Sequence, residues 1–417
     1  MTSDLRSRAT LISLFFLFLI VLVPGTGSHG DMTYWEAWAI SNVRGGLSNT
    51  YSGTTDYLPL YHYVLYIYGI LQGSEEAIIA HIRYLKVVTV LFDLIGLWVV
   101  YKWIEKKVDF TYLFFVCIFN PAFSYNSILW GQIDAIQSAL VFAAFYSLFR
   151  RNIIVSVLLI ILALNLKLQA IIFLPLYGIM LLDACFAAKK WKSLVKGIAC
   201  ALVMEVVILL PFIQNEAGRE GLLNVITNSV GKFGYVTWFA YNFWCLFLTK
   251  STEIPDSTIW FSTISYKTAG LVLFFTSSFF AMLPLLSHMF NNIFSKVKRP
   301  AVREQVWLSG ALISILFFYL NTEMHERYSH PAFLFIIAYS FYSRRFFPLV
   351  LMSLAYFLNL EGILHWLRLN KYSTLIFDPA FVSSIYLILI IYLFYQLYGL
   401  NKHVRSSDVT IKPLEKV

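Results

Sequence analysis

Asp31 follows the first long apolar run of the sequence and stands just before the aromatic residues Tyr34 and Trp35. A carboxylate held at the edge of an apolar layer can remove a proton from a hydroxyl group, so Asp31 is a candidate general base. The residues after it read MTYWEAWA, and an aspartate at that place also suits a helix N-cap. The two interpretations are compatible, because a cap fixes the backbone that aims the side chain.

A second acid also stands among aromatic residues. After the small polar stretch SNTYSGTT come Asp56 and Tyr57, which open the sequence DYLPLY. Pro59 fixes a turn at this point, and Asp56 could hydrogen-bond sugar hydroxyls beside the stacking tyrosines. An Asx-type turn that leads into an interfacial helix accounts for the same residues without a ligand.

The sequences NP and WGQID, the second at residues 130–134, bracket a turn between two apolar runs. Trp130 and Gln132 are candidate contacts to a carbohydrate or a lipid headgroup. Asp134 stands at a predicted helix start, where it could serve as a cap. An aromatic belt at the membrane interface would explain Trp130 without any ligand.

Lys167 lies between two apolar runs, flanked by Asn165 and Gln169. Snorkelling of the lysine to the membrane interface is the simple explanation. Charged residues within membrane segments usually have a function, however, and we therefore favour phosphate binding by Lys167.

The sequence EMHERY at residues 323–328 is hard to explain as a solvated loop. Arg327 offers a planar fork for phosphate oxygens, and His325 can add a second donor. A helix that begins near Pro331 would add its positive end. An ion-paired helix terminus is the alternative interpretation. The spacing of His325 and His330 is not a metal-binding motif, so we predict no metal ion.

Composition sets the class of protein. The 417 residues are 59% hydrophobic and only 13% charged, with a mean hydropathy of +0.69. Soluble domains are about 25% charged, so we predict one all-α polytopic membrane domain over residues 1–417 and no nucleic-acid binding, despite the net charge of +9. The four cysteines show no CxxC spacing, which argues against a disulfide framework or a zinc site. Nucleotide motifs are also missing from the sequence, so we expect no cofactor.

Apolar runs predict about twelve membrane spans. They lie at residues 10–23, 82–103, 110–126, 132–149, 153–166, 168–187, 194–213, 268–292, 305–320, 331–343, 346–366 and 380–400. The first run also has the pattern of a cleavable signal peptide, and an uncleaved first span is the alternative. Residues 25–75 form the predicted first external loop, in which residues 56–73 are expected to be an interfacial helix.

Alternating these spans places most lysines and arginines on one side, including the clusters KKWK at residues 189–192 and KVKR at residues 296–299. The positive-inside rule makes that side cytoplasmic, together with both termini. The same alternation sends the most polar segments to the periplasmic or lumenal side, where we expect the chemistry. These segments are residues 30–63, 120–134, 165–169, 214–232 and 321–330.

Taken together, these motifs resemble those of the GT-C superfamily of multispanning glycosyltransferases. The matching pieces are GD, DYLPLY, NP with WGQID, KLQ and MHERY, which fall between residues 30 and 330. The sequence is most similar to bacterial proteins related to the second mannosyltransferase of GPI-anchor synthesis. It resembles more loosely the dolichol-pathway glucosyltransferases, which have a D-Y-P-P stretch and an H-E-K motif. Leu58 stands where the first proline of D-Y-P-P is found in those glucosyltransferases. The resemblance therefore does not decide which branch of the superfamily applies or which sugar is transferred.

The resemblance implies a GT-C fold and an inverting transfer of a hexose, with mannose as the first candidate. The donor would be a polyprenyl-phosphate sugar, and the acceptor a lipid-linked glycan, another lipid or a protein. Asp31 would be the general base, and Lys167, His325 and Arg327 would lie beside the donor phosphate. The candidate substrate contacts are Asp56, Tyr57, Trp130, Gln132, Asp134, Gln169 and Glu326.

This assignment is coherent chemically. The leaving phosphate gains negative charge, which cations stabilise, and a single displacement assisted by one base inverts the anomeric centre. A polysaccharide polymerase or ligase, which moves whole glycans, is the first alternative. A lipid or glycan transporter is the second, but the sequence shows no internal repeat and gathers its polar motifs on one face.

Overall fold

The computed structural model describes residues 3–27, 29–229, 231–294, 301–371 and 374–409. It is 77% helical and nearly all-α, as the composition predicts. Among these residues, five helices are long and apolar enough to cross a membrane, or up to seven if each of two bent helix pairs counts as one span. These helices indicate a membrane protein, although by this criterion twelve spans are not confirmed.

In the described part of the first half of the chain there are fifteen helical elements. They are α1 (Ser3–Gly25), α2 (His29–Gly45), η1 (Leu47–Ser52), α3 (Pro59–Gln72), α4 (Glu75–His81), η2 (Ile82–Leu85), α5 (Lys86–Trp103), α6 (Phe110–Ile118), α7 (Pro121–Ser124), the π-helical turn η3 (Tyr125–Trp130), α8 (Asp134–Phe149), α9 (Ile153–Leu166), η4 (Leu168–Phe173), α10 (Leu174–Ala188) and α11 (Trp191–Leu209).

The second half adds helices and one small hairpin. Its elements are α12 (Glu216–Thr227), η5 (Phe243–Leu246), β1 (Ile259–Phe261), β2 (Ile264–Ser265), α13 (Tyr266–Phe294), α14 (Arg303–Leu320), α15 (Ala332–Ser343), α16 (Phe347–Leu364), η6 (Leu369–Lys371), η7 (Leu375–Phe377) and α17 (Pro379–Val409). The two strands are antiparallel, with Ile259 opposite Ser265 and Phe261 opposite Ile264.

Each predicted apolar run coincides with one helix or with two or three consecutive helical pieces. Helices form there because a helix satisfies all of its backbone polar groups internally in an apolar surrounding. The run at residues 110–126 is bent by 68° between Phe110–Ile118 and Pro121–Trp130. Asn120 and Pro121 cause this break, since Pro121 cannot continue the preceding helix and Asn120 caps the next one with a 3.0 Å bond to the Ala122 amide.

Helices α8, α14 and α15 form the centre of the molecule, because nearly all of their side chains are buried. Helices that are apolar on every face belong inside a bundle. Gly310 allows α14 and α15 to approach closely, since a Cβ atom there would lie 2.6 Å from the Phe335 ring. Around this centre, α11, α13 and α17 expose apolar side chains such as Val203, Phe275 and Ile391, as expected for surfaces that face lipid.

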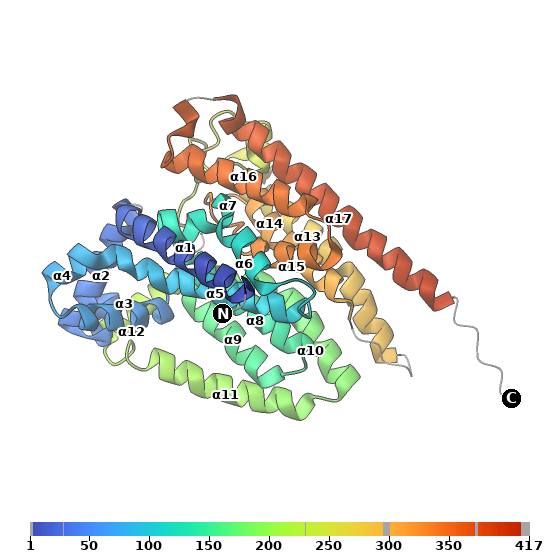
Figure 1. Cartoon of the computed structure of the whole chain (residues 1–417), viewed down its shortest axis with the longest axis horizontal. Coiled ribbons are helices and arrows are strands. Elements are labelled where there is room, and N and C mark those ends of the chain that lie inside the picture. Colours follow the sequence, from blue (N-terminus) through green and yellow to red (C-terminus); the bar gives the residue numbers. More distant parts are fainter. Residues whose placement is uncertain (1–2, 28, 230, 295–300, 372–373, 410–417) are drawn as a thin grey trace.

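The segment at residues 25–75, predicted as the first external loop, is largely folded into helices. Helices α2, α3 and α4 gather at one side of the molecule together with α12 (Figure 1). The predicted helix at residues 56–73 is present as α3, which starts at Pro59. The helix ends before Gly73, whose backbone has a left-handed conformation. The buried His62 joins this helix to its neighbours, with its ring 2.8 Å from the Thr55 hydroxyl and 3.2 Å from the Asn42 amide.

Candidate active site

A buried ion pair joins the ends of two neighbouring helices. Asp134 is the first residue of α8, and Lys167 directly follows the last residue of α9. Because α8 and α9 form an antiparallel hairpin, these two positions meet at the same end of the bundle. Lys167 Nζ lies 2.5 Å from Asp134 Oδ1, and both side chains are at least 90% buried. Lys167 is therefore held inside the protein and does not extend towards the surface.

Arg327 adds a second, largely buried cation to this pair. It comes from the connection between α14 and α15, and its Nη1 donates to Glu326 Oε1 at 2.9 Å. Its Nε lies 3.6 Å from Asp134 Oδ2. Within the part of the chain that the structure describes, this Nε has no hydrogen-bond partner. Arg327 thus keeps a buried donor that a ligand oxygen can use.

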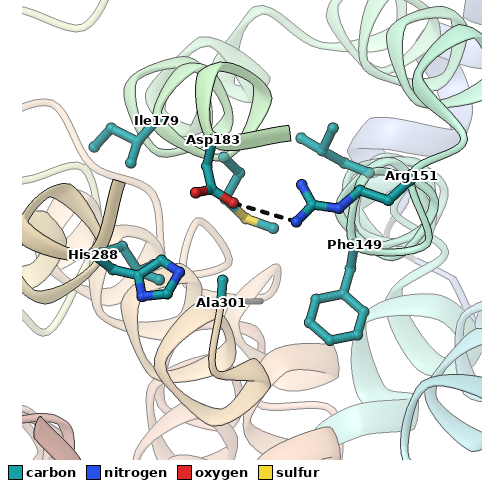
Figure 2. A pocket seen from close by; sticks show the side chains of 9 residues that line it. Phe149, Arg151, Ile179, Asp183, His288 and Ala301 are labelled. Atoms are coloured by element: carbon teal, nitrogen blue, oxygen red, sulfur yellow. Dashed lines mark hydrogen bonds and ion pairs between the residues drawn. The ribbon is translucent and has the colours of Figure 1, made fainter. Parts of the chain in front are cut away.

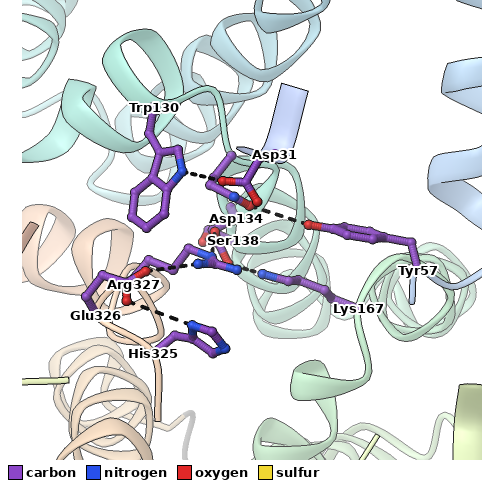
Figure 3. Close-up of polar contacts among 10 residues, drawn as sticks. Asp31, Tyr57, Trp130, Asp134, Ser138, Lys167, His325, Glu326 and Arg327 are labelled. Carbon is purple, nitrogen blue, oxygen red and sulfur yellow. Dashed lines mark hydrogen bonds and ion pairs between the residues drawn. The ribbon is translucent and has the colours of Figure 1, made fainter. Parts of the chain in front are cut away.

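Asp31 reaches the same cluster from α2. Its Oδ2 accepts a 2.7 Å hydrogen bond from Trp130 Nε1, and the Arg327 guanidinium lies 5.0 Å from the centre of the Trp130 ring. The charge of Asp31 acts on both Lys167 and Arg327. Figure 3 shows these four side chains around one centre. Asp31 is the third residue of α2, so it lies inside the first turn and not at the cap position.

The other predicted residues lie around this centre with one exception. The Tyr57 hydroxyl donates to Gln132 Oε1 at 3.4 Å. Gln169 lines a small cavity that also borders Asp134 and Tyr328. Asp56 is the exception: its side chain is 62% exposed and pairs at the surface with Lys232.

The electrostatics of the cluster favour fixed charges on Glu326 and on Arg327. Burial raises the pKa of Glu326, but the bond from His325 and the charge of Arg327 outweigh it and keep that pKa below the usual value. Burial lowers the pKa of Lys167, and Asp134 opposes this shift. Burial also lowers the pKa of His325 below 6.5. Burial therefore disfavours a positive charge on His325, although the neighbouring Glu326 carboxylate opposes this effect.

Aromatic residues of the segment between α12 and α13 surround His325. The Phe233 ring meets the imidazole edge-on at 4.4 Å, and the Trp238 ring lies 6.4 Å away. Tyr328, from the same loop as His325, lies 5.0 Å from the imidazole. The Trp238 amide donates to the Met324 carbonyl at 3.0 Å, which ties this segment to the loop that carries His325. This cover was not predicted, because residues 231–242 have no periodic pattern that would assign them to an element.

Lys86 is a further buried lysine that the sequence did not single out. Its Nζ donates to the Thr26 carbonyl and hydroxyl at 2.7 Å each and to the Ile128 carbonyl at 2.9 Å. These bonds join the end of α1 to η3, the turn that ends at Trp130. Gly131, with φ +92°, leaves room for this contact, because a Cβ there would lie 2.9 Å from Lys86 Cδ. Lys86 therefore fixes the segment that aims Trp130 at Asp31.

Replacing this lysine should destabilise the protein strongly. In Lys86→Met the Thr26 and Ile128 carbonyls lose a buried donor, which should lower the free energy of unfolding by about 2–4 kcal/mol. Thermal unfolding of the purified protein measures this change. Arg83→Met is the matched control, because Arg83 is an exposed cation three residues earlier. Equal unfolding temperatures of the two variants would contradict the role of Lys86.

Buried histidines make the fold sensitive to acid. Burial lowers the pKa of His330 from 6.5 to about 4. Between these values the unfolded chain binds more protons, so this contribution to stability is lost as the pH falls below 6.5. At about pH 5 the loss is roughly 2 kcal/mol. We expect the unfolding temperature of His330→Gln to fall less between about pH 7 and about pH 5 than that of the wild type. The exposed His81→Gln should behave like the wild type.

Among the described residues, no group of three His, Cys, Asp or Glu side chains could hold a metal ion. No protein-family model and no curated protein matches this chain. The chemistry of the site itself is therefore the basis for inferring a function.

Proposed function

We propose that this protein is an inverting membrane glycosyltransferase. It moves a hexose, with mannose as the first candidate, from a polyprenyl-phosphate sugar to a lipid-linked glycan or another lipid or protein acceptor. One observation carries the proposal: the carboxylate of Asp31 shares one centre with two largely buried cations, Lys167 and Arg327, from distant parts of the chain. A base on one side and phosphate-binding cations on the other are what this transfer requires.

In the proposed reaction, the acceptor hydroxyl oxygen attacks the anomeric carbon of the donor. Asp31 takes the hydroxyl proton, and the bond from the anomeric carbon to the phosphate oxygen breaks. The polyprenyl phosphate leaves as a monoester with one more negative charge, which Arg327 and Lys167 stabilise. Single displacement inverts the anomeric configuration.

The neighbouring acids hold these cations in place. Asp134 contacts both of them, and Glu326 bonds to Arg327. Ion pairs of this kind fix the cations before the substrate arrives, so little reorganisation is needed during the reaction. The indole of Trp130 contacts both the base Asp31 and Arg327, and so fixes the position of the base relative to the phosphate-binding cation.

The proposal includes a membrane arrangement. The shorter helices α8, α9 and α15 and the helices α11 and α14 complete about twelve spans, in a single domain over residues 1–417. Both termini then lie in the cytoplasm, and the cluster around Asp31 faces the periplasm or lumen. The folded first external loop lies over the site at the outer surface, where membrane lipids deliver the donor.

The test is a transfer assay with the purified full chain and a membrane extract as the source of acceptor. The donors are radiolabelled polyprenyl-phosphate mannose, glucose and other hexoses. The proposal predicts transfer of a single hexose from one of them, with inverted anomeric configuration in the product. Transfer of whole glycans from a pyrophosphate-linked donor, with no transfer of a single hexose, would instead identify a polymerase or ligase.

A further inference from the structure

A second polar cavity lies at the opposite end of the helix bundle from Asp31. Its volume is about 110 Å³, and it is bordered by Arg151, Asp183 and His288. Helix α8 separates the two sites, because Asp134 is its first residue and Phe149, which borders the cavity, is its last. At 1.5 Å per residue this helix is roughly 24 Å long. The cavity is therefore independent of the proposed active site.

The polar side chains of this cavity are connected by a network of hydrogen bonds. Arg151 Nη2 lies 3.5 Å from Asp183 Oδ2. The other carboxylate oxygen of Asp183 accepts a 2.6 Å bond from Asn292 Nδ2, which also lies 3.1 Å from His288 Nε2. Asp183 and Asn292 are buried. Together they orient the guanidinium and the imidazole, which face each other across the cavity (Figure 2).

The remaining wall is apolar. Leu148, Phe149, Ile179, Met180 and Leu285 line the cavity beside the polar network. Arg151 keeps 28% of its side chain exposed, whereas Asp183 keeps 6%, so the cavity opens along the arginine. A ligand that fits must offer an anionic group to Arg151 and His288 and an apolar part to the other wall.

The depth of the cavity matches that of a lipid headgroup. The helical segment Leu168–Ala188, which consists of η4 and α10, and helix α13 are both long and apolar enough to span a membrane. Asp183 lies five residues before the end of α10, and His288 lies six residues before the end of α13. These positions are roughly 7–9 Å inside the helix ends, and the polar region of each leaflet is roughly 5–8 Å thick.

The surface near this end of α10 is basic. The exposed Lys189 and Lys192 follow α10 in the chain, and the exposed Arg150 precedes Arg151. Basic surfaces of this kind attract anionic lipids. Phosphate is the anionic group common to such lipids, and a guanidinium binds it through paired hydrogen bonds.

We propose that this cavity binds the phosphate group of a membrane phospholipid, with Arg151 and His288 as the phosphate contacts. The site stands whether or not the transfer activity is found, because none of its residues belongs to the centre around Asp31. A lipid bound there would join α8, α10 and α13 at one level of the membrane. Free phosphate offers the same anionic chemistry, and the experiment separates the two sources.

The test is native mass spectrometry of the full chain in detergent, titrated with dioleoyl phosphatidylglycerol. The wild type should bind one lipid saturably, and Arg151→Gln should bind it about tenfold more weakly, because a charge-assisted hydrogen bond is lost. Arg150→Gln is the matched control, since it removes the neighbouring charge outside the cavity, and it should change the affinity less than about twofold. Dioleoylglycerol, which has no phosphate, should not bind saturably.

Competition by inorganic phosphate identifies the source of the phosphate group. Displacement of the lipid would assign the site to free phosphate, and no displacement would assign it to the phospholipid. Both results support phosphate recognition. Equal lipid affinities of Arg151→Gln and the wild type would overturn the proposal. If Arg151→Gln does not fold, Leu285→Trp fills the cavity while keeping the ion pair, and saturable binding that persists in this variant would also overturn it.

Discussion

Asp31→Asn is expected to reduce sugar transfer by about a thousandfold or more while the protein stays folded. The amide cannot accept the acceptor proton, and general bases contribute about 10²–10⁴-fold to enzymatic rates. The amide oxygen can still accept the hydrogen bond from Trp130 Nε1, so the local structure should be kept. The measurement is the transfer rate with saturating polyprenyl-phosphate sugar.

Asp56→Asn is the matched control for this prediction. Both acids belong to the predicted first external loop, but Asp56 is exposed and pairs with Lys232 away from the centre. Its variant should keep transfer within a few-fold of the wild type. Donor binding should also be nearly unchanged in Asp31→Asn. If Asp31→Asn turns over normally, Asp31 is not the base; if it binds no donor, its role is substrate binding.

Arg327→Gln is expected to weaken donor use more than any other single substitution among the proposed phosphate contacts. Loss of one donor to a developing negative charge typically lowers rates by about 10²–10³-fold. The variant should raise the KM for the donor and lower kcat, while the KM for the acceptor changes little. Steady-state kinetics with each substrate varied in turn measure this difference.

The same substitution also affects stability, so a control is needed. Arg327 compensates two buried acids, Asp134 and Glu326, and leaving such charges unpaired costs about 3–5 kcal/mol. The double variant Arg327→Gln with Glu326→Gln removes one of these charges and should recover part of the unfolding temperature without recovering donor use. Lys232→Gln, which removes an exposed cation, should change neither property. Recovery of donor use in the double variant would exclude phosphate binding by Arg327.

The helices could be predicted from the sequence because apolar runs have few structural options in a membrane. That Asp134 and Lys167 lie near each other could also be predicted from the sequence, since each stands at the end of an apolar run on the same predicted side. Their direct ion pair was not predicted, because nothing in a sequence fixes the rotation of α8 against α9. The sequence suggested Lys167 as a group free to bind phosphate, and the structure shows that Asp134 already holds it.

Other features needed the three-dimensional structure. Lys86 appears in the sequence as an ordinary lysine before an apolar run, and only the contact with Thr26 and Ile128 reveals its role. Asp56 has the motif of a binding residue, but the path of the loop before α3 carries it to the surface. In both cases, long-range packing and not local sequence decides the position of the side chain.

The most direct test of the central claim is photo-crosslinking with a polyprenyl-phosphate sugar that carries a small photoreactive group on the sugar. If Asp31 and Arg327 surround one sugar–phosphate bond, crosslinked peptides should come both from the start of α2 and from the loop between α14 and α15. Unmodified donor should compete for both crosslinks, and Asp31→Asn should keep them. Crosslinks confined to other parts of the chain, or unaffected by competing donor, would contradict the proposed site.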